Sequence, residues 1–379
     1  MLSIIIRSTD VAELEILRPE QHAKWIEVLQ SSFQYDFYHL PQYQALAEER
    51  GEGGAHLFLY KEGRYFVAIP LLVRPIDTIP CHAQTGKGWW DATSVYGYAG
   101  PIASHPDVPE SVLHNFRSAL SRTLQERQIV AVFSRLHPLI PQQGLLAGLG
   151  ELVSAGQTVS IDLTLPVDVQ RAQYRNNHKR DINMLRRLNL SCTHDDKVAF
   201  IDDFIEIYYE TMRRAGASNA YFFEHLYFER LVTTLESTMH LFVCLLDNRV
   251  ICGGLFALCD GIVQYHLGGT RNEFIELSPM KLLLDGVRLW ANERQACVFH
   301  LGGGVGAQED ALFHFKAGFT DRRHEFTIWR WVLLPDVYDQ LCEEKIRCSR
   351  QLGLDSVGNG FFPAYRCREC SQTKVAVSE

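Results

Sequence analysis

The sequence predicts an α/β protein with mixed sheets, built from two similar units in tandem. Both halves contain a β-hairpin of similar length, and the tripeptide His-Leu-Phe opens each one, at 56–58 and at 240–242. Helical patterns precede each hairpin, and a helix and a short strand come after it. A repeated order of elements indicates a duplicated supersecondary unit. We therefore predict an N-terminal domain over 1–165 and a C-terminal domain over 166–379.

The first half shows its elements through apolar periodicity. It predicts helices over 19–31, 41–50 and 109–127, and strands over 56–60, 65–73, 129–134 and 158–165. The segment 86–100 is rich in glycine and aromatic residues and contains Asp91, Tyr96 and Tyr98. Aromatic side chains are costly to leave exposed. This segment therefore either binds a ligand or packs as a lid or a domain contact.

The second half repeats this order. The pattern predicts helices over 200–214 and 224–235, a hairpin over 240–246 and 250–258, and strands over 263–267 and 296–301. Ser278 is expected to cap a helix that has Pro279 at its first position. A polar tail is expected over 350–379.

A basic segment joins the two halves. Residues 171–187 contain six Arg or Lys and one Asp, a local balance of +5. The spacing predicts one linking helix over 167–189, with Arg175 and Lys179 on its polar side. Such a face binds the phosphates of a nucleotide, of a diphosphate-linked acceptor or of RNA. The alternative is a solvated connector between the domains.

A glycine cluster follows the strand over 296–301 and contains Gly302, Gly303, Gly304 and Gly306. Glycines let a ligand approach the backbone, and the start of the helix predicted next offers unpaired N–H groups, so the cluster is a candidate anion site. Leu312, Phe315, Lys316 and Phe319 recur on that helix at three- and four-residue spacing, with Lys316 at the edge of the apolar stripe. Lys316 is our candidate for neutralising a phosphate or a developing oxyanion; the alternative is a solvated lysine beside a strand-to-helix turn.

Composition excludes several classes of protein. The chain has 379 residues, of which 46% are hydrophobic and 22% charged, as in folded proteins. No run approaches the about 18 apolar residues that span a bilayer. The N-terminus lacks the apolar core of a secretory signal, so we expect a cytoplasmic protein. The net charge of −8 argues against a general nucleic-acid coat.

Cysteine usage indicates reduced thiols. Most of the ten cysteines stand singly within apolar runs, which is typical of buried, unpaired cysteine. Cys367 and Cys370 form one pair, whereas a structural zinc site usually has two. The spacing therefore favours two free thiols over a metal site, and we expect no tightly bound cofactor.

The C-terminal half resembles the Fem-type (FemABX-like) aminoacyltransferases, relatives of the GNAT superfamily of N-acyltransferases. The resemblance rests on three runs, YHLGGTRNEFIELSPMKLLLDGVRLWANE, HLGGG and FHFKAGF. In the first half it is limited to the hairpin and the sequence YGYAGP. By this resemblance Phe315 and Lys316 fall on the FK pair of the family and Gly302 to Gly304 on its glycine loop. Arg271 falls in the segment before the core helix.

The resemblance implies a fold and a function. Members of the family have two acyltransferase-like domains in tandem and transfer an amino acid from aminoacyl-tRNA to an amine of a peptidoglycan precursor, while relatives use other amines and some use acyl-CoA. We therefore expect an N-acyltransferase of cell-envelope precursors, with tRNA and a small or nucleotide-linked amine as partners. The alternatives are an acyl-CoA-dependent enzyme of polysaccharide or secondary-metabolite biosynthesis and a catalytically silent binding protein.

One departure from the wider superfamily bears on the donor. Acyl-CoA users carry an R/Q-x-x-G-x-G/A loop, and the corresponding segment from Arg271 to Ser278 has no glycine. Its bulky residues hinder the approach of a pyrophosphate to the backbone, which favours aminoacyl-tRNA over acyl-CoA. Attack by an amine also requires a base. The candidates are Asp91, Glu273, Glu309 and Asp310, among which the sequence does not choose.

Overall fold

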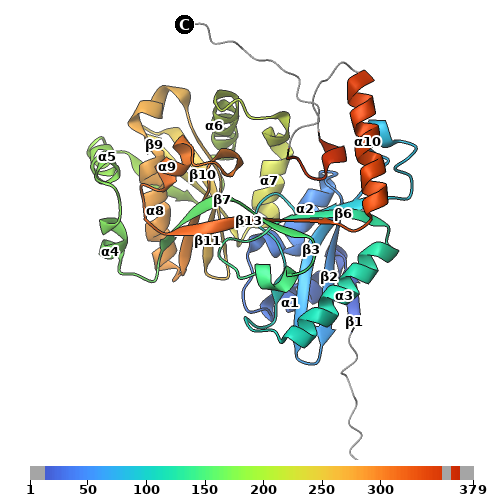
Figure 1. The fold of residues 1–379 in the computed structure, drawn as a ribbon. Coiled ribbons are helices and arrows are strands. Elements are labelled where there is room, and N and C mark those ends of the chain that lie inside the picture. The colour runs from blue at the N-terminus through green and yellow to red at the C-terminus, as the bar shows by residue number, and fades with distance from the viewer. Residues whose placement is uncertain (1–12, 352–359, 368–379) are drawn as a thin grey trace, which may run out of the picture. The chain divides into compact units, whose positions relative to one another are not determined.

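The computed structural model describes residues 13–351 and 360–367 (Figure 1). Contacts between residues divide the chain into two compact units. The first unit comprises Met1–Phe33, Ala47–Val153 and Thr327–Glu379, and the second comprises Gln34–Leu46 and Ser154–Phe326. Among the described residues, no helix is long and apolar enough to cross a membrane.

The first unit contains one mixed sheet. Its strands, in spatial order, are β1 (Glu13–Leu17), β2 (Gly54–Glu62), β3 (Tyr65–Pro75), β4 (Trp90–Thr93), β6 (Ile129–Arg135) and the second part of β13 (Arg323–Val332). Neighbouring strands are antiparallel except for β4 and β6, which are parallel. The short strand β5 (Ile102–Ala103) pairs with β3.

The sheet of the second unit has the same plan. Its strands, in spatial order, are β8 (Ser191–Asp195), β9 (Met239–Leu246), β10 (Arg249–Cys259), β11 (Ile262–Thr270), β12 (Val298–Gly302) and β7 (Glu151–Asp162). Only the fourth and fifth strands, β11 and β12, are parallel, as in the first unit. The predicted duplication is therefore confirmed strand by strand.

Helices follow the same repeat. The α-helices are α1 (His22–Gln30), α2 (Pro41–Glu49), α3 (Glu110–Glu126), α4 (Val167–Ala172), α5 (Asn176–Arg187), α6 (Ile201–Arg214), α7 (His225–Thr234), α8 (Met280–Glu293), α9 (Ala311–Lys316) and α10 (Pro335–Gln351). The 3-10 helices are η1 (Pro19–Gln21), η2 (Phe37–His39), η3 (Pro80–His82), η4 (Gln143–Leu146), η5 (Asn219–Tyr221), η6 (Asn272–Leu277), η7 (Val305–Ala307) and η8 (Ala364–Arg366). In both units one long helix, α3 or α8, connects the two parallel strands.

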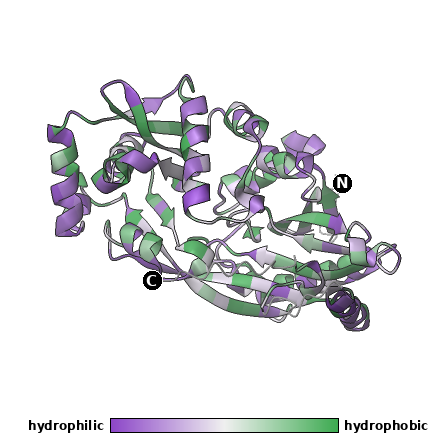
Figure 2. Cartoon of the chain, turned by 90° about the horizontal axis from the view of Figure 1, so that it is seen from above, coloured by the Kyte–Doolittle hydropathy of each residue, from purple (hydrophilic) through white to green (hydrophobic). Residues whose placement is uncertain are grey.

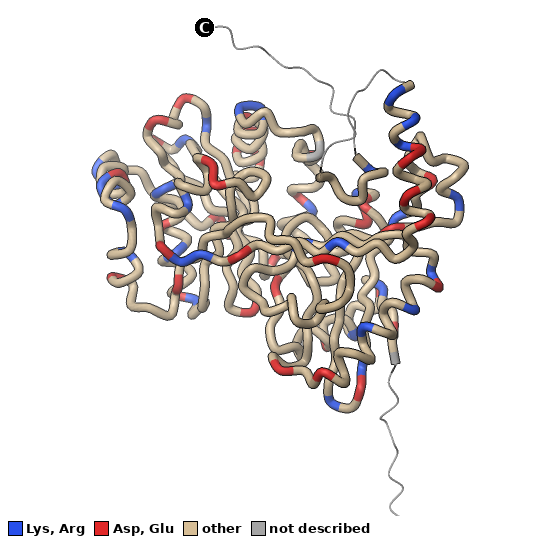
Figure 3. The backbone as a smooth tube through the Cα atoms, viewed as in Figure 1, with Lys and Arg blue, Asp and Glu red and all other residues tan. Residues whose placement is uncertain are grey.

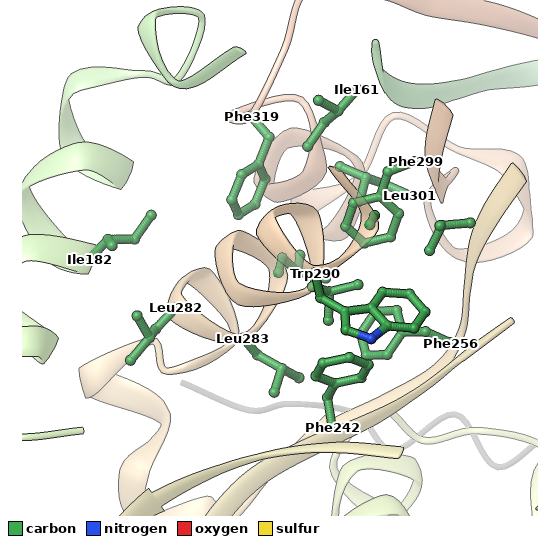
Figure 4. Close-up of a cluster of buried hydrophobic side chains, with 14 of the residues drawn as sticks. Ile161, Ile182, Phe242, Phe256, Leu282, Leu283, Trp290, Phe299, Leu301 and Phe319 are labelled. Atoms are coloured by element: carbon green, nitrogen blue, oxygen red, sulfur yellow. The ribbon is translucent and has the colours of Figure 1, made fainter. Parts of the chain in front are cut away.

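The core of the second unit lies between α8 and the sheet. Figure 4 shows Leu283 and Trp290 of α8 pointing at Phe242 and Phe256 of the strands, and all four belong to one buried cluster. On the opposite face α6 approaches the sheet closely, because a Cβ added at Gly269 would lie 2.5 Å from the hydroxyl of Thr211 on α6. The sheet is therefore covered on both faces, as expected for a parallel pair of strands.

The core of the first unit is built in the same way. Phe116 and Leu120 of α3 belong to the same buried cluster as Phe58 of β2 and Val132 of β6. A smaller cluster, which includes Tyr365, forms around residues of β6 and α10. Figure 2 shows that the strands are largely hydrophobic, while the helices carry hydrophilic faces.

Three expectations from the sequence need correction. The linking segment forms two helices, α4 and α5, because Arg175 between them has an extended backbone and its N–H bonds the Gly318 carbonyl at 2.8 Å. Ser278 is not the N-cap of α8. Its backbone is left-handed, the N-cap position is taken by Pro279, and no side chain caps the start of the helix. The predicted tail from 350 is only partly a tail, because Tyr365 is fully buried.

The division into units also differs from the predicted boundary at 165/166. Segment 34–46 and residues 154–165 lie in the second unit, and the chain after residue 326 lies in the first. The physical reason is the exchange of last strands. Residues 159–162 of β7, which end the first half of the sequence, pair with β12 of the second unit. Residues 328–332 of β13, which follow the second half, pair with β6 of the first unit.

Candidate active site

The parallel strands β11 and β12 separate within the second unit and form a fork. They are paired only from Ile262 with Val298 to Gln264 with His300, although β11 continues to Thr270 and β12 to Gly302. Beyond the last pair each arm is held from outside, β11 by β10 and β12 by β7. The fork thus consists of two arms that are not paired with each other and are each fixed in the sheet by an outer neighbour.

Two irregularities in strand pairing lie at the level where the arms part. The β10–β11 register shifts at Leu255/Phe256, which leaves His266 as the extra residue of β11. The β12–β7 register shifts between His300 and Gly302, which leaves Leu301 as the extra residue of β12. Because a bulge bends its strand and interrupts the ladder, these two bulges account for the divergence.

The equivalent strands of the first unit stay together. After the last β4–β6 pair, the N–H of Ser94 bonds the Phe133 carbonyl at 2.9 Å, and the N–H of Arg135 bonds the Ser94 hydroxyl at 3.2 Å. The fork is therefore specific to the second unit, and the difference locates the candidate active site there.

Lys316 lies across the mouth of this fork. Its Nζ donates a hydrogen bond of 2.7 Å to the carbonyl of Gly303, which follows β12, and lies 5.5 Å from the centre of the Tyr265 ring on β11. The side chain is only 7% exposed. Helix α9, which carries Lys316, is buttressed by α5, since His178 is 3.0 Å from the Phe315 carbonyl. Lys316 is therefore held in place rather than solvated.

Burial changes the acidity of this lysine. Removal from water lowers the pKa of Lys316 to about 8, and the nearby carboxylate of Asp310 raises it in part. At neutral pH the ammonium remains the main form, but its charge is poorly solvated. A poorly solvated ammonium interacts more strongly with a developing negative charge than one in water.

The glycine cluster supports Lys316 rather than an anion. The carboxylate of Asp310 accepts the N–H of Phe313 at 2.9 Å and that of Val305 at 3.1 Å, so it occupies the start of α9 where the sequence predicted an anion site. Gly303 is needed for close packing, because a Cβ there would lie 2.8 Å from the Gln157 carbonyl. Gly302 is buried at the end of β12 and Gly304 precedes the turn η7.

The helix α9 buries a slightly different stripe from the predicted one. Phe313 is buried, Phe315 is half-buried, and Leu312 is 38% exposed. The predicted stripe used Leu312 in place of Phe313. The six-residue helix begins at Ala311, directly after its cap Asp310, so its core-facing side is set by the cap rather than by the full periodic pattern.

Arg271 is already neutralised by the second unit. Its guanidinium lies 2.8 Å from Asp203, 3.3 Å from Glu206 and 3.5 Å from Glu210, all on α6. Its Nε also bonds the Val250 carbonyl at 2.9 Å. Arg271 therefore fixes the end of β11 to α6, and its guanidinium contacts α6 rather than Lys316 or Gly303.

The backbone at the start of α8 is also engaged. The N–H of Ser278 bonds the Ile275 carbonyl at 2.9 Å, that of Lys281 bonds the Ser278 carbonyl at 3.1 Å, and that of Leu282 bonds the Pro279 carbonyl at 3.0 Å. These N–H groups at the junction of η6 and α8 are therefore bonded to nearby carbonyls, whereas a glycine loop would offer such groups to a pyrophosphate.

The basic helix α5 carries exposed charge at the edge of the second unit, where Figure 3 shows a group of blue residues. Arg175 bonds the His314 carbonyl at 3.3 Å and Lys179 bonds the Ala172 carbonyl at 2.7 Å. Both contacts are with backbone oxygens, so neither side chain loses its charge to a carboxylate there.

Residues predicted from the first half lie in the first unit. Asp91 is fully buried in β4, where its carboxylate pairs with Arg74 at 2.7 Å, with Arg366, and with the Tyr365 hydroxyl at 3.2 Å. Tyr96 is 37% exposed and Tyr98 is half-buried near His137. Asp91 therefore anchors residues 365–366 within the first unit, and its carboxylate is already paired with two arginines.

Of the remaining base candidates, Asp310 caps α9 near Lys316, and the other two are exposed. Glu273 is exposed and pairs with Arg249, and Glu309 is exposed. The polar residues that do lie where the arms part are Gln264, His266 and His300, which are buried. Sequence reasoning missed them, although His266 and His300 stand inside the runs YHLGG and HLGGG. Polar residues within an apolar strand were the available signal.

Metal ligands do not gather in the described residues: no group of three or more His, Cys, Asp or Glu could hold an ion there. Cys367 is buried, and Cys370 lies outside the described part of the chain. That these two cysteines are free thiols rather than metal ligands therefore stays a prediction.

Comparison with known proteins places this geometry in context. Residues 172–316 match the family model described as an acetyltransferase (GNAT) domain. This match contains both arms of the fork and ends at Lys316. Among curated proteins, no sequence matches the chain significantly.

Two of the solved structures that resemble this chain superpose over most of it. The crystal structure of FemX superposes with a TM-score of 0.65 at 13% sequence identity, over 86% of this chain and 99% of that one. A conserved protein of unknown function from Bacteroides thetaiotaomicron VPI-5482 superposes with a TM-score of 0.54 at 8% identity, over 85% of this chain and 100% of that one. At these identities the likeness concerns the fold.

Proposed function

Because residues 172–316 form a GNAT acyltransferase domain in a chain with the fold of FemX, we propose that the protein transfers an aminoacyl group to an amine. The proposed donor is an aminoacyl-tRNA, and the proposed acceptor is an amine of a cell-envelope precursor or a related, nucleotide-linked metabolite. The observation that carries the proposal is the position of Lys316 between the two arms of the fork.

The chemistry follows from that position. An amine attacks the carbonyl of the donor, and a negative charge develops on the carbonyl oxygen. The ammonium of Lys316 has three N–H donors, of which the Gly303 carbonyl takes one. A carbonyl lying between Tyr265 and Gly303 would receive a charge-assisted hydrogen bond from a poorly solvated cation. Removal of one such donor typically costs about 100- to 1,000-fold in kcat.

The choice of donor rests on η6 and the start of α8. Acyl-CoA is gripped through its pyrophosphate by backbone N–H groups at a helix start. Here the N–H groups of Ser278 and Lys281 bond carbonyls of their own turn, and Arg271 is shared among three carboxylates. These contacts support a donor that does not need the pyrophosphate grip. The GNAT match supports the alternative, an acyl-CoA-dependent N-acyltransferase.

A transfer assay tests the proposal. The full chain is incubated with radiolabelled aminoacyl-tRNAs or acyl-CoAs and a panel of amines that includes nucleotide-linked cell-envelope precursors. We expect acyl transfer from aminoacyl-tRNA, loss of turnover in Lys316→Met, and parental turnover in His314→Ala, an exposed position on the same helix. Transfer from acyl-CoA alone would replace the donor, and failure with every donor would leave a binding protein.

A further inference from the structure

A row of polar side chains crosses one face of the second unit's sheet at the point where the fork opens. Its members come from β13, β7, β12, β11 and the segment before η2, and are His324, Ser160, His300, Gln264 and Asp36. Gln264 and His300 are the last pair of the β11–β12 ladder. The row therefore crosses the sheet at the last pair of β11 and β12, just before the two arms of the fork separate.

Three short hydrogen bonds connect parts of this row. Gln264 Nε2 donates to the Asp36 carboxylate at 2.7 Å, and His300 Nδ1 lies 2.7 Å from Gln264 Oε1. At the other end, Ser160 Oγ lies 2.7 Å from His324 Nε2. Ser160 and His300 are direct neighbours across the β7–β12 ladder, a relation that brings two side chains on one face within reach of each other.

The hydrogen bonds fix the state of His300. A carboxylate only accepts, so Gln264 must present its NH₂ group to Asp36 and its oxygen to His300. The Gln264 oxygen also only accepts, so His300 carries its proton on Nδ1, and Nε2 bears the lone pair. Asp36 is itself held, because its Oδ1 accepts the N–H of Phe37 at 2.7 Å.

The row has one end near solvent. Asp36, Ser160 and His300 are 0% exposed and Gln264 is 1% exposed, whereas His324 is half-buried. Burying four polar side chains on a sheet face costs free energy that an apolar face would avoid, even when they are hydrogen-bonded. A sheet that needed only stability would pack apolar residues at these positions.

We propose that this row carries to solvent the extra proton of an acceptor that arrives as an ammonium, while the proton that the neutral amine then loses on attack passes to the leaving group. This inference rests on the proposed function. In the reaction the amine nitrogen forms a bond to the carbonyl carbon, and the bond from that carbon to the donor oxygen, or sulfur, breaks. The amine gives up one proton and the leaving group takes one. An acceptor that arrives as an ammonium gives up a second proton, which must leave the buried site.

Each member of the row has a stated part. His300 Nε2 takes the proton, either directly or through one water. A bridging water carries it from His300 to the hydroxyl of Ser160, the neighbour of His300 across the β7–β12 ladder. Ser160 then passes its own proton to His324, its hydrogen-bond partner, which exchanges with solvent. Gln264 and Asp36 are positioning residues that keep the His300 lone pair on Nε2. Other titratable groups around the row include His39 and Cys259 beside Asp36, His266 beyond the last β11–β12 pair and Lys316 at the mouth of the fork.

Substitution of Ser160 interrupts the row with the smallest change in volume. In Ser160→Ala we expect kcat at saturating substrates to fall by about 10-fold or more, the lower part of the range for general acid–base catalysis, with KM unchanged. Ser160→Thr, which keeps the hydroxyl, is expected to restore turnover. Thr158→Val is the matched control, because it removes a buried hydroxyl from the same strand outside the row. Its kcat is expected to equal that of the parent.

The pH dependence of kcat and the tautomer of His300 distinguish a proton relay from a purely structural role of these residues. His324→Gln is expected to lower kcat most at low pH, where an ammonium acceptor must shed its extra proton. Imidazole nitrogen NMR of histidine-labelled protein is expected to show His300 protonated on Nδ1, and this signature is expected to change in Gln264→Glu. Parental kcat in both Ser160→Ala and His324→Gln across the pH range would overturn the proposal, as would a His300 protonated on Nε2.

The two proposals fail in different ways. If the parent protein transfers no acyl group, the proposed function is wrong and the relay has no proton to carry. If the parent is active and Ser160→Ala retains full turnover, the relay is wrong while the acyltransferase function stands.

Discussion

The Nζ of Lys316 lies 5.5 Å from the centre of the Tyr265 ring, so a residue of α9 reaches the arm of the fork formed by β11. The same nitrogen bonds the carbonyl of Gly303, which follows the other arm. A single cation therefore spans an opening between two strands that are each fixed from outside. This relation makes Lys316 a constituent of the site rather than a neighbour of it.

Replacement of Lys316 by methionine is expected to separate activity from stability. Lys316→Met removes the cation from the fork, and we expect kcat to fall about 100- to 1,000-fold. The free energy of unfolding is expected to stay the same or to rise by up to about 2 kcal/mol, because relief from burying a charge exceeds the loss of one hydrogen bond. Denaturant unfolding beside the transfer assay measures both. A large loss of stability with normal kcat per folded molecule would contradict the assignment.

Lys316 also predicts how activity and stability vary with pH. The charged form is the proposed catalyst, so kcat is expected to fall as the pH rises through about 8, its pKa in the folded protein. The unfolded chain holds this proton up to about pH 10.5 and the folded one only to about 8. Between these values the unfolded state binds more protons, so this group makes the protein more stable as pH rises, by about 3 kcal/mol in total.

A comparison with Lys316→Met isolates this contribution. The free energy of unfolding of the parent, minus that of Lys316→Met, is expected to rise by about 3 kcal/mol between about pH 8 and pH 10.5, because the parent loses the buried charge there. A difference that is constant over this range would mean that Lys316 keeps its ordinary acidity in the folded protein.

The repeat and the position of Lys316 could be predicted from the sequence because both depend on local patterns. A hairpin can be recognised from the apolar pattern of a short stretch of sequence. Lys316 could be placed because it follows a predicted strand and a glycine cluster, and lies at helical spacing from its apolar neighbours. Strand β9 (Met239–Leu246) agrees closely with the prediction of 240–246, whereas β7 (Glu151–Asp162) begins seven residues before the strand predicted over 158–165.

The fork could not be predicted because it depends on pairing between distant segments. The separation of β11 from β12 comes from bulges whose partners lie in β10 and β7, and nothing within β11 itself shows which edge will be unpaired. Arg271 stands at the first position of the segment that corresponds to the pyrophosphate loop of acyl-CoA users. In the structure it contacts three carboxylates of α6, which lie 61 to 68 positions earlier in the chain. The Asp36–Gln264 hydrogen bond joins residues separated by 228 positions.

Asp285 is expected to be a critical residue for stability. Its carboxylate is fully buried and accepts bonds from Arg288 at 2.9 Å, from Arg171 at 2.9 Å, from Arg186 at 2.8 Å and from the Tyr174 hydroxyl at 3.0 Å. Asp285→Ala leaves Arg288, which is 1% exposed, without its counter-charge, and we expect a loss of about 3–5 kcal/mol. Arg186→Ala, at the exposed end, is expected to cost less than about 1 kcal/mol. Similar costs in urea unfolding would show that the burial of Arg288 does not matter.

The basic face of α5 is expected to bind phosphate. The double variant Arg175→Glu with Lys179→Glu reverses two charges that bond only backbone carbonyls, and we expect weaker binding of tRNA or of a nucleotide-linked acceptor. The dependence of binding on salt is expected to become less steep, by about one unit of slope for each phosphate that the variant no longer neutralises. Lys87→Glu with Arg213→Glu makes the same change of net charge elsewhere and serves as the control. An equal salt slope in both double variants would leave α5 as a connector.

The last prediction concerns Arg271 and the donor. If Arg271 serves to hold α6, then Arg271→Met lowers stability by about 1–2 kcal/mol, because Asp203, Glu206 and Glu210 lose their common cation. The same variant is expected to leave the KM for the donor unchanged. Calorimetry with CoA is expected to show weak binding in parent and variant alike, since the amides at the start of α8 are engaged in their own turn. Tight, stoichiometric binding of CoA that Arg271→Met abolishes would reverse the donor assignment and turn Arg271 into a pyrophosphate ligand, while Lys316 and the fork would keep their parts in acyl transfer.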